Sequence, residues 1–366
     1  MTSTTDTKLA IDGGSPVRSE AFPVRPEIAP ADAPDAVQAL EAELAAYIGD
    51  DAEAVACRDG ATAYALALAA LGITEGEAIL PALASAQAVD AARAAGLTIV
   101  PAEVEAESIA LGNRGLARAL SDATRVIVAA HAFGHPYAAA ELSRVIEPRG
   151  LPLIEDASAA LGGGYRLRST GLLGTVAIFA FGDQHLLSGD GAALVTTDTA
   201  LAARLRDARD HQSAGLEANA AQLALGELRN ADSELETRRQ LAWELTFDLR
   251  TMKSLNGMPH SRWVVHGYDC YVVRVRGLIW KRPIEEAVAA LEAEGIPATV
   301  ALGPSLHLDP AIRTVLGDDE RLEDDGFPVA RRLPGELIAL PLHSGMTDLE
   351  IADIAAALAK IEAAST

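Results

Sequence analysis

The chain has 366 residues, of which 49% are hydrophobic and 22% charged. This is enough for a large α/β domain with a smaller one beside it, and it excludes a disordered chain. No apolar run reaches the roughly 18 residues of a membrane span, and the first residues do not resemble a signal peptide. The net charge of −22 disfavours nucleic acid and anionic membranes as partners. Two distant cysteines without metal-ligand spacing favour a reducing compartment, so we expect a cytoplasmic protein without a metal site.

The first half of the chain alternates predicted helices and strands. Strands that are apolar throughout are typical of burial on both faces, and this alternation is typical of right-handed crossovers in a mostly parallel sheet. Apolar spacing predicts helices over 36–48, 59–71, 86–95, 115–120 and 138–146, and strands over 78–83, 97–104, 125–132 and 151–154.

The pattern changes near residue 250. Before it, strands are predicted at 175–181 and 193–197, followed by a helical region over 201–249 with a break near 212–215. Beyond it, a small and mostly antiparallel sheet with helices is expected. We therefore predict an N-terminal arm (1–27), a large domain (28–250) and a small C-terminal α/β domain (251–366). The elements predicted in the small domain are strands at 271–275, 298–301 and 337–340, and helices at 284–293 and 347–361.

Chemically distinctive residues follow three of the predicted strands. The strand at 151–154 is followed by Glu155 and Asp156, His185 follows the strand at 175–181, and His131 lies at the end of the strand at 125–132. Because ligands bind outside the carboxyl ends of parallel strands, these residues are expected at one site. The segment 59–62 opens a helix, whose free N–H groups would suit a phosphate.

Several motifs, in order and spacing, resemble the sugar and cyclitol aminotransferases of the DegT–StrS type. The resemblance implies the fold of the fold type I enzymes that use pyridoxal phosphate (PLP), with a mostly parallel, seven-stranded type of sheet and a small-molecule substrate. It also implies a homodimer, or a heterodimer with a homologue, in which the arm is exchanged between subunits. The motifs are Leu9–Arg18, Ile154–Ala157 with Gly162, Phe179–Phe181 followed by Gly189–Thr196, and Leu340–His343 followed by Met346 and Thr347.

The resemblance assigns roles to several residues that suit this family. Asp156 falls at the aspartate that pairs with the pyridine nitrogen of PLP. Gly60 and Ala61 fall at the Gly-Thr turn that cradles the phosphate, of which the resemblance carries over the backbone part, and His131 matches a recurrent family histidine. Gln184 precedes the position of the Schiff-base lysine and is a further candidate site residue.

Four positions depart from the family pattern. Ser85 falls near the aromatic residue that stacks on the cofactor ring, Ala159 at a glutamine, and Ala180 at a serine that binds the phosphate. His185 falls at the Schiff-base lysine.

The lysine itself is missing from the whole predicted large domain. The chain has four lysines, and none lies between residues 9 and 252. Without that amine no internal aldimine forms, so covalent PLP and ordinary transamination are not expected. PLP or its amine form, pyridoxamine phosphate (PMP), bound without a covalent link, stays open. The lysines are Lys8, Lys253, Lys281 and Lys360.

These residues leave three kinds of function open. The first is an enzyme of sugar, cyclitol or other specialised natural-product metabolism, repurposed for chemistry other than transamination, with His185 and Asp156 as acid–base residues. A histidine at the lysine position also resembles the sugar 3-dehydratases, which use PLP or PMP. The second is a noncatalytic partner subunit of a homologue that carries the lysine. The third is a ligand-binding or regulatory protein that retains the cleft.

Overall fold

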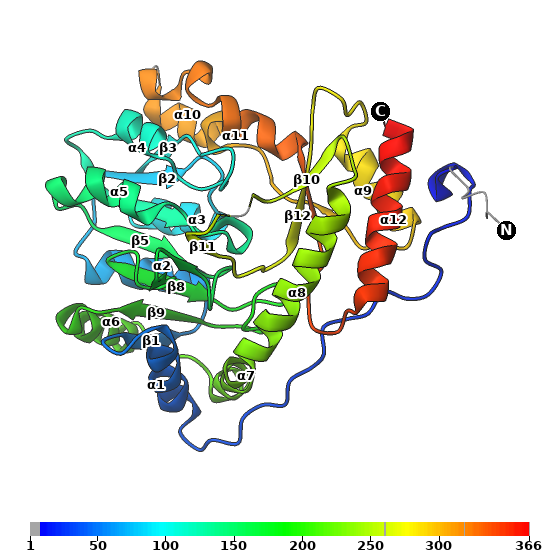
Figure 1. Cartoon of the computed structure of the whole chain (residues 1–366). Helices are drawn as coiled ribbons and strands as arrows, with labels where there is room; N and C mark the ends of the chain where they lie inside the picture. The colour runs from blue at the N-terminus through cyan, green and yellow to red at the C-terminus, as the bar shows by residue number, and fades with distance from the viewer. Residues whose placement is uncertain (1–7, 260, 318, 366) are drawn as a thin grey trace.

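A seven-stranded sheet forms the centre of the larger part of the molecule (Figure 1). The computed structural model describes residues 8–259, 261–317 and 319–365. The sheet order is β1-β9-β8-β5-β4-β2-β3, and only the pairs made by β9 are antiparallel. The predicted, mostly parallel sheet is therefore confirmed. Its strands are β1 (Glu53–Cys57), β2 (Glu77–Pro81), β3 (Thr98–Ala102), β4 (Thr124–Ala130), β5 (Leu153–Asp156), β8 (Val176–Ala180) and β9 (Ala192–Thr196).

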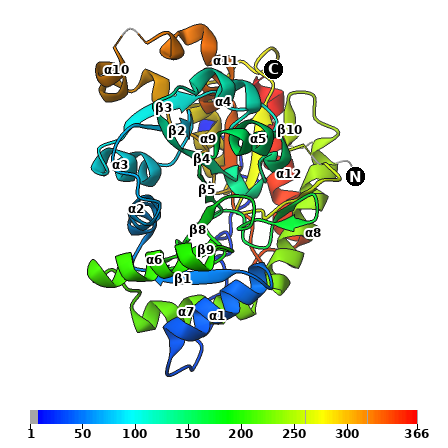
Figure 2. The same cartoon turned by 90° about the vertical axis from the view of Figure 1, so that its left-hand side faces the viewer.

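Helices cover both faces of this sheet. In Figure 2, α2 and α3 lie on one side and α5 on the other. Alternate residues of each strand pack against the two helical layers, which explains why the strands are apolar throughout. The helices are α1 (Ala36–Ile48), α2 (Gly60–Ala70), α3 (Ala86–Ala94), α4 (Asn113–Ala119), α5 (Ala139–Ile146), α6 (Thr199–His211), α7 (Ala218–Arg229) and α8 (Ala231–Leu249).

A second sheet of four antiparallel strands follows, in the order β10-β12-β14-β13. Its core is shared with α9, α12 and the second half of α8. The predicted antiparallel sheet of the small domain is thus also present, while the domain boundaries remain a prediction. The elements are β10 (Leu255–Gly257), β12 (Tyr271–Val275), β13 (Thr299–Val300), β14 (Leu337–Leu340), α9 (Ile284–Ala293) and α12 (Asp348–Ser365).

Two segments beyond residue 250 return to the large sheet's side of the molecule. Strand β11 (Val264–Val265) pairs with β6 (Gly164–Tyr165), which pairs with β7 (Arg168–Ser169). The backbone N–H of Leu306 donates to the carbonyl of Ala82 at 2.8 Å, and α10 (Pro310–Leu316) packs against the large core. The remaining elements are α11 (Pro328–Arg332) and short 3-10 turns at Ala10–Asp12, Ala132–Gly134, Glu147–Arg149, Leu306–Leu308, Glu320–Leu322, Asp324–Gly326 and Leu333–Gly335.

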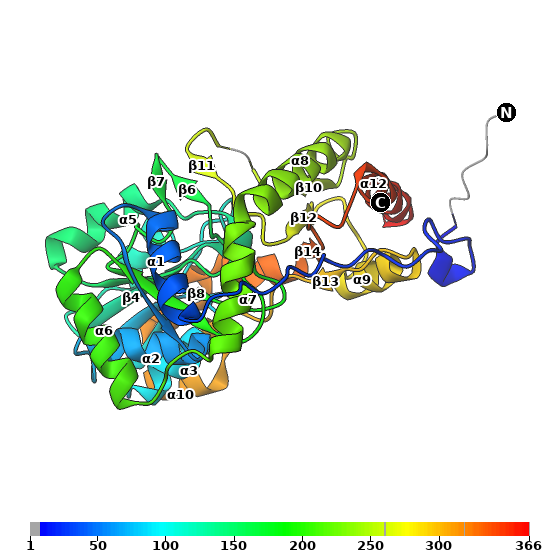
Figure 3. The same ribbon diagram turned by 90° about the horizontal axis from the view of Figure 1, so that it is seen from below.

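The N-terminal arm runs along both parts of the molecule (Figure 3). Near its start, the buried carboxylate of Glu294 accepts hydrogen bonds from the backbone N–H groups of Ala10 (2.8 Å) and Val17 (3.0 Å). Further along, the Arg25 guanidinium donates to the backbone carbonyl of His185 at 2.7 Å. The arm therefore packs on its own chain from α9 to the loop after β8. Residues 1–7 of the predicted arm lie outside the described residues.

The helices of the described residues include none that is both long enough and apolar enough to cross a membrane.

Candidate functional site

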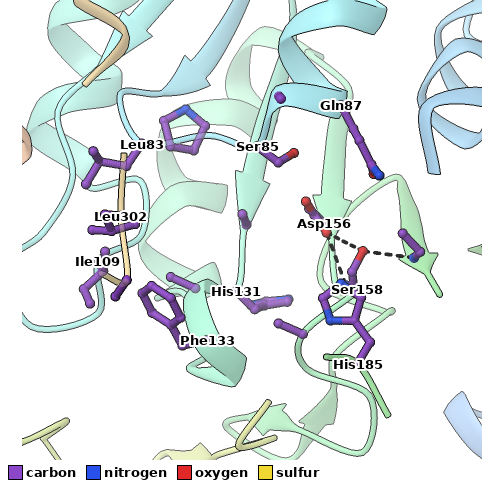
Figure 4. Close-up of a pocket in the computed structure, with 17 residues that line it drawn as sticks. Leu83, Ser85, Gln87, Ile109, His131, Phe133, Asp156, Ser158, His185 and Leu302 are labelled. Carbon is purple, nitrogen blue, oxygen red and sulfur yellow. Dashed lines mark hydrogen bonds between the residues drawn. The ribbon is translucent and has the colours of Figure 1, made fainter. Parts of the chain in front are cut away.

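A cavity of about 370 Å³ opens at the carboxyl ends of β4, β5 and β8. Figure 4 shows that its two sides differ in chemistry. One side carries apolar groups, and the other carries hydrogen-bonding groups. The apolar side holds Leu83, Ile109, Phe133 and Leu302, and the polar side holds Ser85, Gln87, Asp156, Ser158 and His185.

Most of the predicted site residues line this cavity. They are His131, Asp156, Ser85, Ala159, Ala180 and His185. Gly60 and Ala61 are not among its lining residues, because the side chain of Gln87 lies over Gly60 and separates it from the cavity. Gln184 is also outside the lining, since it is exposed in the turn that precedes His185.

Asp156 is held by neighbours on both sides. The Tyr64 hydroxyl donates to its Oδ2 at 2.7 Å, while the Ser158 hydroxyl and backbone N–H donate to Oδ1 at 2.7 and 3.2 Å. The Ser158 Oγ accepts from the N–H of Ala180 at 2.9 Å, which connects β5 to β8. Burial, followed by the charge of Asp156, raises the pKa of Tyr64 well above its ordinary value, so the phenol stays protonated as a donor.

His185 and Asp269 form a hydrogen-bonded pair at the cavity wall. The Nδ1 of His185 lies 3.0 Å from Asp269 Oδ1. Because the carboxylate accepts, Nδ1 carries the hydrogen and Nε2 is the nitrogen that can exchange a proton with a ligand. Burial opposes the imidazolium, but the bond and charge of Asp269, with the charge of Asp156, outweigh it and raise the pKa of His185 above 6.5.

The backbone before Asp269 is itself constrained. Tyr268 adopts a φ of +47°, in the left-handed region that non-glycine residues rarely occupy. Its ring stacks on His266 at 3.9 Å between centroids, and its carbonyl accepts from the Arg238 guanidinium at 3.1 Å. Arg238 is in turn paired with Glu234 at 2.7 Å. These contacts fix Asp269 in the position that reaches His185.

His131 belongs to a buried polar cluster whose bonds are all internal. Its Nε2 lies 2.7 Å from Glu155 Oε1, and its Nδ1 accepts from the backbone N–H of Tyr137 at 3.2 Å. The ring stacks on that of Tyr137. Glu155 also accepts from three backbone N–H groups within residues 171–174, at 2.6 to 2.9 Å. Both ring nitrogens are engaged, so His131 contributes shape to the cavity rather than a free acid or base.

A carboxylate caps the start of α2, where the resemblance places a phosphate. Asp59 accepts from the N–H of Thr62 at 2.7 Å, so one of the N–H groups expected to be free is engaged. A Cβ placed on Gly60 would lie 2.3 Å from Gln87 Oε1 and 2.8 Å from the Ala180 Cβ. The charge of Asp59 at the helix start and the amide of Gln87 beside Gly60 therefore flank the turn where the resemblance places the phosphate, and the negative charge disfavours an anion there.

The residues present do not fit PLP held in the manner of the family. No lysine lines the cavity, so no amine is in place for an aldimine. Asp156 is already bonded to Tyr64 and Ser158, and Ala180 offers no hydroxyl at the cradle. The described residues also include no cluster of three or more histidine, cysteine, aspartate or glutamate side chains that could hold a metal ion.

Comparison with known proteins places the chain in a family. The model of the DegT/DnrJ/EryC1/StrS aminotransferase family matches residues 32–359. The chain belongs to this family. It is 30% identical over 321 residues (84% of this chain, 82% of the relative) to the dTDP-3-amino-3,4,6-trideoxy-alpha-D-glucose transaminase of Streptomyces venezuelae. It is 31% identical over 227 residues (56% and 54%) to the L-glutamine:2-deoxy-scyllo-inosose aminotransferase of Micromonospora echinospora.

The fold of this family member is that of solved relatives. A crystal structure of DesI in the presence of its TDP-sugar product aligns with a TM-score of 0.85 and 24% sequence identity, covering 97% of this chain and 96% of the other. The predicted fold, the α/β fold of PLP-dependent aminotransferases, is thus confirmed.

Reasoning from the sequence missed Tyr64, Gln87 and Asp269. Tyr64 and Gln87 lie on helices that the sequence predicts, but nothing local shows which helix face meets the cavity. Asp269 follows a glycine and a tyrosine and lies two residues before the predicted strand at 271–275. An acidic residue in this aromatic and apolar stretch is a weak signal that it has a partner elsewhere.

Proposed function

We propose that this family member is an acid–base enzyme that acts on an oxo-sugar or oxo-cyclitol without forming an aldimine, with His185 as the proton carrier. The observation that carries the proposal is the His185–Asp269 hydrogen bond of 3.0 Å at the cavity wall. It lies where the family resemblance places the Schiff-base lysine. The names of the two relatives support the substrate class, since one contains a dTDP-linked sugar and the other an inosose, which is an oxo-cyclitol.

The geometry suits removal of a proton from the carbon next to an oxo group. Neutral His185 takes this proton on Nε2, and the electron pair of the broken C–H bond becomes the C=C bond of an enolate. The electron pair of the C=O π bond moves to the oxygen. The imidazolium exchanges its Nε2 proton with solvent and returns a solvent proton to the carbon, which restores the C=O bond and neutral His185. Asp269 keeps the hydrogen on Nδ1, and the charges of Asp269 and Asp156 stabilise the imidazolium that forms.

The test is solvent exchange at that carbon. The protein is incubated in D₂O with 2-deoxy-scyllo-inosose or a dTDP-linked 4-oxo-6-deoxyhexose, and loss of the C–H signal is followed by proton NMR. The proposal expects exchange faster than in the protein-free control with at least one of the two. Exchange at the protein-free rate with both would contradict it and favour a noncatalytic partner subunit.

The pH dependence of exchange should report the His185–Asp269 pair. Because the base form is required, the rate should rise as the pH passes the pKa of His185, which lies above 6.5. In Asp269→Asn the hydrogen bond can persist but the charge is gone, so burial dominates, the pKa falls and the rise moves to lower pH. Rates measured from pH 5 to 9 test this, with Asp190→Asn, an exposed acid outside the cavity, as the control. An unmoved midpoint in Asp269→Asn would remove Asp269 from the mechanism.

PLP and PMP should bind weakly. No lysine lines the cavity to form an aldimine, and the Asp59 carboxylate puts a negative charge at the helix start to which the resemblance assigns the phosphate. We expect no cofactor absorbance band to remain after incubation with PLP or PMP and gel filtration. Asp59→Ser keeps a capping side chain but removes the charge, so it should tighten binding relative to wild type. A stoichiometric band retained by the wild type would instead favour the dehydratase-like alternative.

The assembly and location that the sequence suggests also remain proposals. We infer a homodimer or a heterodimer with a lysine-bearing homologue, and a cytoplasmic protein. Support comes from the family membership and from the two cysteines, which are both free.

A further inference from the structure

The cavity contains no side chain suited to a diphosphate. None of its lining residues is a lysine or an arginine. This covers all lysines and arginines of the chain, because each of them lies in the part that the structure describes. A desolvated diphosphate needs cationic or backbone donors. The polar side of the cavity instead holds the acidic group of Asp156, and the carboxylate of Asp269 is bonded to His185 on the same side.

The guanidinium groups behind the polar side are already engaged. Arg25 donates to the carbonyls of His185 and Leu186 at 2.7 and 2.6 Å and lies 3.4 Å from Glu227. Arg238 is paired with Glu234 and donates to the carbonyl of Tyr268. Moving either one to a ligand would take a cationic partner from a buried carboxylate, which is costly. The α2 terminus does not replace them, because Asp59 caps it.

What the cavity does offer is suited to a neutral polyol. On one side the Gln87 amide, the Ser85 hydroxyl and the His185 imidazole can exchange hydrogen bonds with hydroxyl groups. On the opposite side Leu302 and Phe133 present apolar surface to the C–H face of a ring (Figure 4). The volume of about 370 Å³ is near the lower end of the roughly 300–1,000 Å³ that is usual for ligand pockets. A single six-membered ring suits this size better than a nucleotide sugar.

We infer that the site selects an uncharged oxo-cyclitol or free oxo-sugar and discriminates against sugars linked to a nucleoside diphosphate. The inference rests on the proposed function and narrows its substrate class to a ring without phosphate. The polar and apolar sides of the cavity supply contacts to the hydroxyl groups and the C–H face of a ring. The absence of lysine and arginine from the lining disfavours a diphosphate.

Calorimetric titration of the full chain tests this inference. The probes are 2-deoxy-scyllo-inosose and a dTDP-linked 4-oxo-6-deoxyhexose, each at 50 and 300 mM NaCl. The cyclitol should bind at least about tenfold more tightly, with a Kd that changes less than about twofold with salt, because no ion pair to phosphate is involved. Tighter binding of the dTDP-sugar, or binding of neither probe, would overturn the inference.

A matched pair of variants locates the binding. Leu302→Trp fills the apolar side and should weaken cyclitol binding about tenfold, whereas Leu308→Trp, at a 40%-exposed position outside the cavity, should not change it. Circular dichroism checks that both variants fold. Equal Kd values for both variants would show that the ring binds elsewhere and would overturn the inference. Cyclitol binding without solvent exchange would refute the proposed chemistry alone, and exchange with tighter binding of the dTDP-sugar would refute the substrate class alone.

Discussion

Replacing His185 with alanine should lower the rate of solvent exchange by roughly 10²–10⁴-fold, the usual contribution of a positioned acid–base group. The side chain is 26% exposed, and the loop backbone is held by Arg25 through carbonyl groups that the substitution keeps. We therefore expect His185→Ala to fold and to retain cyclitol binding. Exchange measured by NMR and binding measured by calorimetry separate the loss of a proton carrier from the loss of the cavity.

Two comparisons make the His185 result interpretable. Asp190→Asn changes an exposed residue of the same loop and should exchange at the wild-type rate. His185→Lys supplies an amine but should not by itself give transamination, because Ser85, Ala159 and Ala180 lack the groups that hold the cofactor ring and phosphate in the family. Wild-type exchange in His185→Ala would reduce His185 to a structural residue. Transamination by His185→Lys would show that the cofactor is held without these groups.

Replacing Glu155 with alanine should lower the free energy of unfolding by about 3–5 kcal/mol, the cost of leaving buried partners of a charged group unpaired. Its fully buried carboxylate accepts from His131 and from three backbone N–H groups within residues 171–174. All four donors would lose their acceptor. Urea unfolding followed by circular dichroism measures the change.

Glu236 provides the control for this prediction. It lies on the exposed face of α8, and its replacement by alanine should change the free energy of unfolding by no more than about 0.5 kcal/mol. Glu155→Gln keeps one acceptor oxygen and should fall between these limits. A loss below about 1 kcal/mol in Glu155→Ala would mean that the cluster does not hold the loop before β8 in place.

Much of the fold could be predicted because burial sets the sequence pattern. Apolar runs such as 125–132 mark strands covered on both faces, and amphipathic spacing fixes α1 and α9 to the residue. The strand at 53–57 is absent from the prediction. It has five residues and pairs on one side only, with β9. Its short apolar run ends close to the start of the predicted helix at 59–71, so it does not stand out as a separate element.

The candidate site could be predicted only in part. Asp156 and His185 follow parallel neighbouring strands, so topology alone brings them to one edge of the sheet. Their partners come from distant segments. Asp269 is 84 residues from His185, and Tyr64 is 92 residues from Asp156. No local periodicity encodes such pairs, and they appear only once helices and loops are packed.

The N-terminal arm makes the chemistry of the cavity depend on residues that never touch it. Near its start the arm is hydrogen-bonded to Glu294 in the small-sheet part of the molecule. At its other end Arg25 is hydrogen-bonded to the loop that carries His185. The arm therefore connects the small sheet to the loop that positions the imidazole. If the small sheet moved away from the cavity, the hydrogen bonds at one end of the arm would have to break. The position of His185 thus depends on the contacts of the arm as well as on the strand that precedes it.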